Sequence, residues 1–322
     1  MKDSPQPPAF APLNRAYNTI FRPGRLSIGL VAPLEGHGSD PVPDMSRHIE
    51  RARLADALGF SALWLRDVPF NVPSFGDAGQ IFDPFVYLGA LAASTHDIAL
   101  GVASIVLPLR HPAHVAKAAA SADVLSGGRL LLGVASGDRP DEYPALGMSF
   151  EDRGARFRDS VDYIRAMEGS YPRAETTQGT LSGGIDMLPK PSAGRLPLLI
   201  TGGSQQAPDW VAQNGDGWMT YPRDAAQQGR VVGAYRQRLA EAGLPDKPVM
   251  QSLYIDLVSQ ADAPPRPIHL GFQSGTDHLR RYLREVRALG INHVALNLRF
   301  NGADIEDNMK RLTDQILPDF HD

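Results

Sequence analysis

Residues 98–138 read as a strand, a helix and a second strand, and this stretch constrains the fold more than any other part of the chain. The runs 98–107 and 130–135 are apolar and rich in branched side chains, which is typical of strands buried on both faces. Between them, four apolar residues fall on one face of a predicted helix: Val115, Ala119, Ala122 and Leu125. The stretch therefore predicts a β-α-β crossover, the repeating unit of a parallel sheet.

Small residues accompany the ends of both predicted strands. The first strand carries Gly101, Ala103 and Ser104, and the second is followed by Ser136 and Gly137. Ligands of parallel α/β folds bind at the carboxyl ends of the strands. Because small side chains leave room there, the pattern predicts a site for a flat ligand at this edge of the sheet.

The rest of the chain repeats the same alternation. Eight strand candidates can be counted along the 322 residues, and nearly all are followed by a helical pattern. This predicts a parallel α/β fold, and eight units in such a length favour a TIM-like (β/α)8 barrel over an open sheet. Residues 169–196 break the alternation and are expected to form an insertion across one mouth of the barrel. Prolines predict an extended N-terminal arm over residues 1–24, which leaves residues 25–322 as the barrel domain.

Composition excludes several classes of partner and chemistry. The 32 basic and 36 acidic residues give a net charge of −4 with no basic run, so we expect no nucleic-acid partner. No window approaches the roughly 20 apolar residues of a membrane span. The chain has no cysteine, which excludes thiolate chemistry and fits a cytoplasmic protein. His111 and His114 lack a third ligand, so no metal site is predicted.

One loop has a pattern typical of phosphate binding, although the chain contains neither a dinucleotide fingerprint nor a P-loop. Gly202-Gly203-Ser204 ends a predicted strand before a predicted helix, where backbone N–H groups can face an anion. Arg153, at the start of an earlier helix, could supply a second contact. The alternatives are an ordinary glycine-rich loop and a solvated surface charge.

Six motifs occur in a characteristic order and spacing: Leu100–Pro108 followed by Arg110-His111-Pro112, Asp123–Arg129, Gly133–Gly137, Thr201–Ser204, Asp216–Trp218 and Ala288–Ile291. With these motifs the chain resembles the bacterial luciferase-like flavin-dependent oxidoreductases and monooxygenases over nearly its whole length. The resemblance implies a TIM-like barrel with a reduced flavin on the carboxyl ends of the strands. It also implies a non-proline cis peptide at Ala103-Ser104, under the flavin ring.

The resemblance further assigns residues to the cofactor. It implies that the flavin phosphate is held by Gly202, Gly203, Ser204 and Arg153. Ser136 stands where the luciferase α chain has an arginine on the phosphate. Tyr143 is expected beside the ring or the ribityl chain.

The resemblance does not directly assign the catalytic residues, because Val68 stands where many members of the family have a histidine. Arg66 and Asp67 follow the second strand and are expected to reach the mouth. Asp67 could accept a proton, and Arg66 could hold an anionic substrate or a developing oxyanion. The alternative is that these two residues form a mutual ion pair that shapes the loop.

The function implied by the resemblance is that of a flavin-dependent monooxygenase or oxidoreductase. It would take reduced FMN from a separate reductase and act on a small organic substrate. Hydride transfer with coenzyme F420 is the alternative within the enzyme class. A non-catalytic flavin-binding protein and a phosphate-binding barrel lyase without flavin are the alternatives outside it. A homodimer is expected from the resemblance alone.

Overall fold

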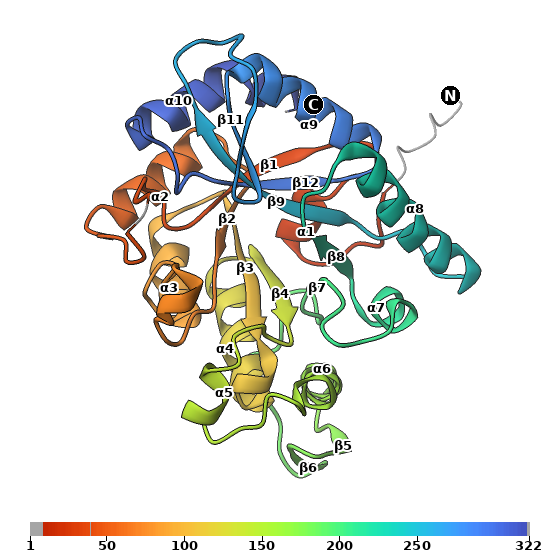
Figure 1. The fold of residues 1–322 in the computed structure, drawn as a ribbon. Helices are drawn as coiled ribbons and strands as arrows, with labels where there is room; N and C mark the ends of the chain where they lie inside the picture. Colours follow the sequence, from red (N-terminus) through yellow and green to blue (C-terminus); the bar gives the residue numbers. More distant parts are fainter. Residues whose placement is uncertain (1–8, 39, 321–322) are drawn as a thin grey trace.

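The computed structural model describes residues 9–38 and 40–320, and its central element is a closed barrel of parallel strands (Figure 1). The strands follow one another around the barrel in chain order: β1 (Ser27–Val31), β2 (Ala62–Leu65), β3 (Ala99–Val106), β4 (Leu130–Ala135), β7 (Leu198–Thr201), β8 (Gly217–Thr220), β9 (Val249–Leu257) and β12 (His293–Asn297). The barrel closes because β9 pairs with both β8 and β12. The predicted (β/α)8 barrel is therefore confirmed.

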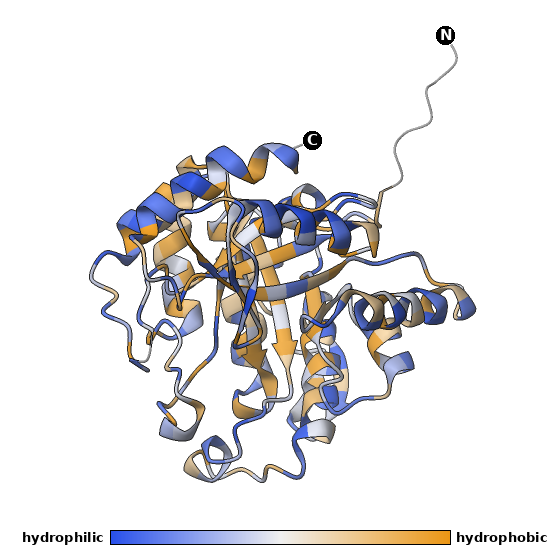
Figure 2. Ribbon diagram, turned by 45° about the horizontal axis from the view of Figure 1, so that its top comes forward, coloured by the Kyte–Doolittle hydropathy of each residue, from blue (hydrophilic) through white to orange (hydrophobic). Residues whose placement is uncertain are grey.

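Each barrel strand is followed by a helix on the outside of the barrel (Figure 1). These helices are α2 (His48–Ala57), α3 (Pro84–Ser94), α4 (Pro112–Leu125), α6 (Arg153–Glu168), α7 (Pro208–Asn214), α8 (Ala225–Glu241), α9 (Thr276–Ala288) and α10 (Ile305–Gln315). The strands are mainly apolar, whereas the helices carry hydrophilic residues outward (Figure 2). Within the described ranges, no helix combines the length and the apolar character needed to cross a membrane.

The barrel interior explains one of the glycines of β3. A Cβ atom at Gly101 would lie only 2.2 Å from the indole ring of Trp64 on β2, so this position needs a glycine. The Trp64 Nε1 donates to Nε2 of His293 over 2.8 Å. Burial lowers the pKa of His293 to about 3, so its ring is neutral and accepts this hydrogen bond.

The prediction of an extended arm over residues 1–24 is wrong for part of that segment. A short helix, α1 (Arg15–Ile20), is capped by Asn14. Tyr17 and Phe21 are buried and pack in the cluster that fills the amino-terminal end of the barrel. The Tyr17 hydroxyl donates to the carbonyl of Asp216, just before β8. This segment therefore closes the barrel, because the apolar end of the barrel must be covered; residues 1–8 of the expected arm lie outside the described residues.

The insertion does not cross the mouth of the barrel. Its strands β5 (Arg173–Thr176) and β6 (Gly179–Ser182) form an antiparallel hairpin. The hairpin packs beside α6 (Figure 1), and its tip reaches the start of α4, where the carbonyl of Gln178 lies 3.2 Å from Nε2 of His111. The buried Leu181 anchors it to the core. A second hairpin, β10 (Arg266–Ile268) with β11 (Gly271–Ser274), extends the sheet beside β9.

Candidate active site

A bulge interrupts β3 near its carboxyl end. Its pairing with β4 shifts between Val102 and Ile105, and the Ala103-Ser104 peptide bond is cis, as expected. Ala103 and Ser104 are half-buried, whereas the rest of β3 is buried. The Ser104 hydroxyl bonds to the hydroxyl of Thr201 at the end of β7. The bulge is thereby joined directly to the start of the glycine loop.

The glycine loop after β7 forms a tight turn of unpaired amides. Gly202, Ser204 and Gln205 all have a positive φ, and the Ser204 hydroxyl donates to the carbonyl of Thr201 over 2.8 Å. The N–H groups of Gly203, Ser204 and Gln205 meet no acceptor among the described residues. Successive free N–H groups in such a turn form a concave site for an anion.

The helix after this loop begins later than expected. The sequence predicts that Gly202-Gly203-Ser204 runs directly into a helix, but α7 starts at Pro208 and spans seven residues. The positive φ angles of Ser204 and Gln205 are incompatible with a right-handed helix. An anion at this loop would therefore face the amides of the turn and not the start of a helix.

Arg153 lies beside this turn, as the first residue of α6. A Cβ atom at Gly154 would approach the Cβ of Gln205 to 2.9 Å, so the start of α6 touches the loop. The Arg153 guanidinium stacks 3.6 Å from the centroid of the Phe150 ring, and its Nη1 donates to the carbonyl of Phe150. Its Nε is buried and has no hydrogen-bond partner among the described residues. A cation with a free donor thus lies next to the turn of free amides.

Ser136 and Tyr143 lie together after β4. The Tyr143 hydroxyl donates to the carbonyl of Ser136, and the phenol is fully buried, edge-on to Phe150. Burial raises the pKa of Tyr143 to about 12. The side chain is enclosed and its hydroxyl is engaged, and its expected contact with a flavin ring or ribityl chain stays a prediction. Tyr143 instead holds the Ser136 loop against Phe150, on which Arg153 stacks.

Asp67 does not point into the site as a free base. Its side chain is 2% exposed and forms a two-pronged pair with Arg110, at 2.7 and 3.0 Å. It also accepts the N–H of Val106 at the end of β3 over 3.0 Å. The expected pairing of Asp67 with Arg66 is wrong, because Arg110 binds both oxygens of the Asp67 carboxylate and Arg66 pairs with Asp77. The expected role of Asp67 as a proton acceptor stays a prediction. Asp67 joins the ends of β2 and β3.

Arg66 belongs to a different cluster. Its guanidinium pairs with Asp77, and its backbone N–H donates to Oε1 of Gln80 over 2.9 Å. Arg299, which follows β12, also reaches Asp77, with 3.1 Å between Nη1 and Oδ2. Arg139, which follows β4, donates to the carbonyl of Asp77 over 3.2 Å. Three arginines from three strand ends thus meet at one loop residue.

Glu142 is a buried acid beside this cluster. It is almost fully buried, and its Oε1 lies 4.0 Å from Nη1 of Arg139, with no hydrogen-bond partner among the described residues. Burial raises the pKa of Glu142 to about 7, and Arg139 counteracts this effect only in part. Near neutral pH the carboxyl group can therefore hold or release a proton.

The stability of the fold is expected to report this titration. Because the folded pKa of about 7 exceeds the ordinary 4.5, Glu142 favours folding most at low pH, and this contribution is lost as the pH rises through about 7. Glu142→Gln removes the effect and keeps the shape. Urea unfolding at a pH of about 5 and about 8 should show the variant gaining stability relative to the native chain at the higher pH. Parallel pH profiles would contradict the assignment.

Sequence reasoning did not assign five residues of these clusters to the site: Asp77, Arg110, Arg139, Glu142 and Arg299. Two of them have a visible signal. Arg110 stands in the motif Arg110-His111-Pro112, and Arg299 follows the last strand at the edge where ligands bind. Asp77 lies in a loop and Glu142 begins the short helix α5 (Glu142–Ala145), and only the folded chain defines the paths of both connections.

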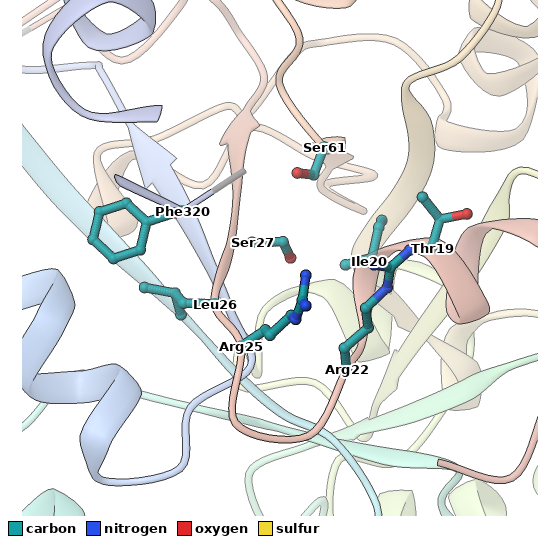
Figure 3. Close-up of a pocket in the computed structure, with 8 residues that line it drawn as sticks. All are labelled: Thr19, Ile20, Arg22, Arg25, Leu26, Ser27, Ser61 and Phe320. Carbon is teal, nitrogen blue, oxygen red and sulfur yellow. The ribbon is translucent and has the colours of Figure 1, made fainter. Parts of the chain in front are cut away.

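A pocket at the other end of the barrel contains none of the predicted site residues. It is lined by residues that include Arg22, Arg25, Ser61 and Phe320, next to the start of β1 (Figure 3). These residues precede the barrel strands or lie near the chain end, so the pocket faces away from the carboxyl ends of the strands. The candidate active site is the set of loops around Ser104, not this pocket.

Comparison with known proteins identifies a family and several relatives. A family model described as luciferase-like monooxygenase matches residues 25–265. An uncharacterized protein of Mycobacterium tuberculosis is 32% identical over 189 residues, which cover 54% of this chain and 67% of that protein. The 4-hydroxyprotoasukamycin monooxygenase of Streptomyces nodosus subsp. asukaensis is 31% identical over 55% of this chain and 47% of its own length. The oxygenase component of a flavin-dependent trigonelline monooxygenase from Acinetobacter baylyi is 30% identical over 51% of this chain and 42% of its own length.

Solved structures share the fold. The monooxygenase RslO1 from Streptomyces bottropensis aligns with a TM-score of 0.77 and 20% identity, over 91% of this chain and 99% of its own. An F420-dependent secondary alcohol dehydrogenase aligns with a TM-score of 0.75 and 18% identity, over 91% of this chain and 98% of its own. At these identities the likeness shows the barrel fold alone.

Proposed function

The chain belongs to the luciferase-like monooxygenase family, and from this premise we propose that it is a flavin-dependent monooxygenase or oxidoreductase that binds reduced FMN and acts on a small organic substrate. The observation that carries the proposal is the turn at Gly202–Gln205. Its free N–H groups lie beside a guanidinium with an unpaired buried donor, that of Arg153. A phosphate monoester fits this combination of amides and cation.

The residues of the chain have separate tasks in this proposal. The amides of Gly203 and Ser204 hold the phosphate, and Arg153 offsets its charge. Ala103 and Ser104 support the flavin ring at the bulge of β3, and Ser136 lines the neighbouring loop. When bound, the reduced flavin supplies the electrons of the reaction. The buried carboxyl of Glu142, with its pKa of about 7, is the acid at this end of the barrel best matched to holding a proton near neutral pH.

The partners are part of the proposal. One relative is named as an oxygenase component, which supports a separate reductase as the source of reduced flavin for this chain. The homodimer expected from the resemblance stays a prediction, as does a cytoplasmic location.

F420 is the alternative cofactor. An F420-dependent dehydrogenase shares the fold as fully as a monooxygenase does, so the fold does not separate the two. With F420 the reaction would be a hydride transfer without oxygen. Loss of catalysis with retention of flavin binding is the alternative from another class.

Anaerobic titration tests the proposal. The purified protein is titrated with reduced FMN and, in parallel, with reduced F420, and air is then admitted while the absorbance is followed. We expect saturable binding of FMN and a changed rate of its reoxidation. Preference for F420 would replace the monooxygenase assignment with hydride transfer. Binding of FMN without any effect on its reoxidation would favour the non-catalytic alternative, and binding of neither cofactor would refute the proposal.

A further inference from the structure

Three arginines from different loops converge on one residue, Asp77, at the carboxyl end of the barrel. Arg66 and Arg299 both contact Oδ2 of Asp77, and Arg139 donates to the carbonyl oxygen of the same residue. The other carboxylate oxygen of Asp77 accepts the N–H of Gly79 over 2.9 Å. Burial opposes ionisation, but Arg66 and the Gly79 amide hold the pKa of Asp77 below its ordinary value. Both carboxylate oxygens of Asp77 and its backbone carbonyl are thus occupied by hydrogen bonds or ion pairs.

The charges of this cluster do not balance. Three guanidinium groups face the carboxylate of Asp77 and, at longer range, the exposed carboxylate of Asp138, whose charge acts on Arg66 and Arg139. The next acid, Glu142, is 4.0 Å from Arg139 and makes no hydrogen bond with it. Its burial also raises its pKa to about 7, so it is often neutral near that pH. A net positive charge therefore remains while Glu142 is protonated.

Two of the three arginines are also short of hydrogen-bond acceptors. The side chains of Arg139 and Arg299 are only 7% and 9% exposed. Nη1 of Arg139 and Nε of Arg299 are buried with no hydrogen-bond partner among the described residues. Burial, and then the charge of Arg66, lower the pKa of Arg139. Nη1 of Arg139 has the Glu142 carboxyl 4.0 Å away, too far for a hydrogen bond, and Nε of Arg299 is likewise unpartnered within the described ranges. Buried charged donors without an acceptor are costly, so an anion bound here would complete both donors.

The cluster is accessible and is separate from the proposed phosphate site. The side chain of Arg66 is 25% exposed, which leaves a path from solvent. Arg66 and Arg299 follow β2 and β12, on one side of β3 in the barrel order, whereas Arg139 follows β4 and the Gly202–Gln205 turn follows β7, on the other side. An anion held by Arg66 and Arg299 would therefore lie across the β3 bulge from the cofactor phosphate.

We propose that Arg66, Arg139 and Arg299 bind the anionic group of the substrate, a carboxylate or a similar oxyanion, and so select negatively charged organic substrates. The planar guanidinium fork matches the two oxygens of such a group. The inference rests on the proposed function, because it places the substrate beside the flavin.

Calorimetric titration with matched probes tests the inference. The probes are benzoate and benzamide, with acetate and acetamide as a smaller pair for a site too narrow for a ring. We expect at least one anion to bind about tenfold or more tightly than its neutral amide, the typical effect of one charge-assisted hydrogen bond. If neither anion binds more tightly than its amide, the inference is overturned.

Variants locate the binding. Arg139→Met and Arg299→Met should each weaken anion binding about tenfold, and Arg139→Lys, which keeps the charge, should restore part of it. Arg25→Met is the matched control, because this exposed arginine lies at the opposite end of the barrel. Equal losses in Arg25→Met and in the site variants would refute the assignment. Circular dichroism checks the fold of each variant, and if Arg139→Met does not fold, Arg139→Lys and Arg299→Met decide the question.

Repeating the titration with FMN separates the two proposals. Anion binding that survives saturation with FMN supports a substrate site. Displacement of the anion by FMN would assign the arginines to the cofactor phosphate and overturn the inference. Anion binding in a protein that does not bind FMN would refute the proposed cofactor, while the anion site would stand.

Discussion

Replacement of Asp67 with Ala is expected to lower the free energy of unfolding by about 3 kcal/mol, the lower end of the range for breaking a buried ion pair. The carboxylate is buried, pairs with Arg110 through both oxygens and accepts the Val106 amide. Its removal leaves the Arg110 cation with Asp83 alone, at 2.8 Å, which is why the lower end applies. Urea unfolding at neutral pH measures the effect.

A matched exposed pair provides the control for Asp67. Asp97 pairs with Arg15 at 2.6 Å, and both side chains are well exposed, so Asp97→Ala should cost less than about 1 kcal/mol. The double variant Asp67→Ala, Arg110→Met should lose less stability than the sum of the two single changes. A loss below about 1 kcal/mol for Asp67→Ala would show that the pair is not structural.

Arg153→Ala is expected to weaken FMN binding by about 10- to 100-fold, the range for losing one hydrogen bond to a charged group. Riboflavin, which lacks the phosphate, should bind the variant and the native chain equally. The physical reason is that the Arg153 donor beside the Gly202–Gln205 turn would contact only the phosphate. Quenching of the fluorescence of the two oxidised flavins on binding measures both affinities.

The two ligands also distinguish a contact from an indirect effect of Arg153. Equal losses for FMN and riboflavin would mean that Arg153 acts through the loop that it supports at Phe150. Unchanged affinity for FMN would remove Arg153 from the site. Arg22→Ala, at the amino-terminal end of the barrel, controls for the loss of one positive charge.

Local periodicity was sufficient to predict the barrel. The predicted strands 98–107 and 130–135 match β3 and β4 to within one residue at each end, because a parallel strand buried on both faces is a short, continuous apolar run that is visible in the sequence. The N-terminal arm was predicted wrongly for the converse reason. Nothing local in residues 15–21 shows that Tyr17 and Phe21 cover the end of a barrel whose strands lie far along the chain.

For the candidate site, too, the sequence predicted one part correctly and left another part open. Sequence placed Arg66 and Asp67 at the correct edge, since loops after parallel strands share one end of the barrel. It could not decide their partners. Successive residues of an extended segment point in opposite directions, so Asp67 meets Arg110 and Arg66 meets Asp77.

By itself, then, the sequence determined the alternation of strands and helices, the family to which the chain belongs and the edge of the barrel that carries the site. Only the tertiary structure decided which charged groups are paired and which are left with free donors. Pairing depends on side chains brought together from loops as distant as those of Asp77 and Arg299. Their separation in space is set by the closure of the whole barrel, which no local pattern encodes.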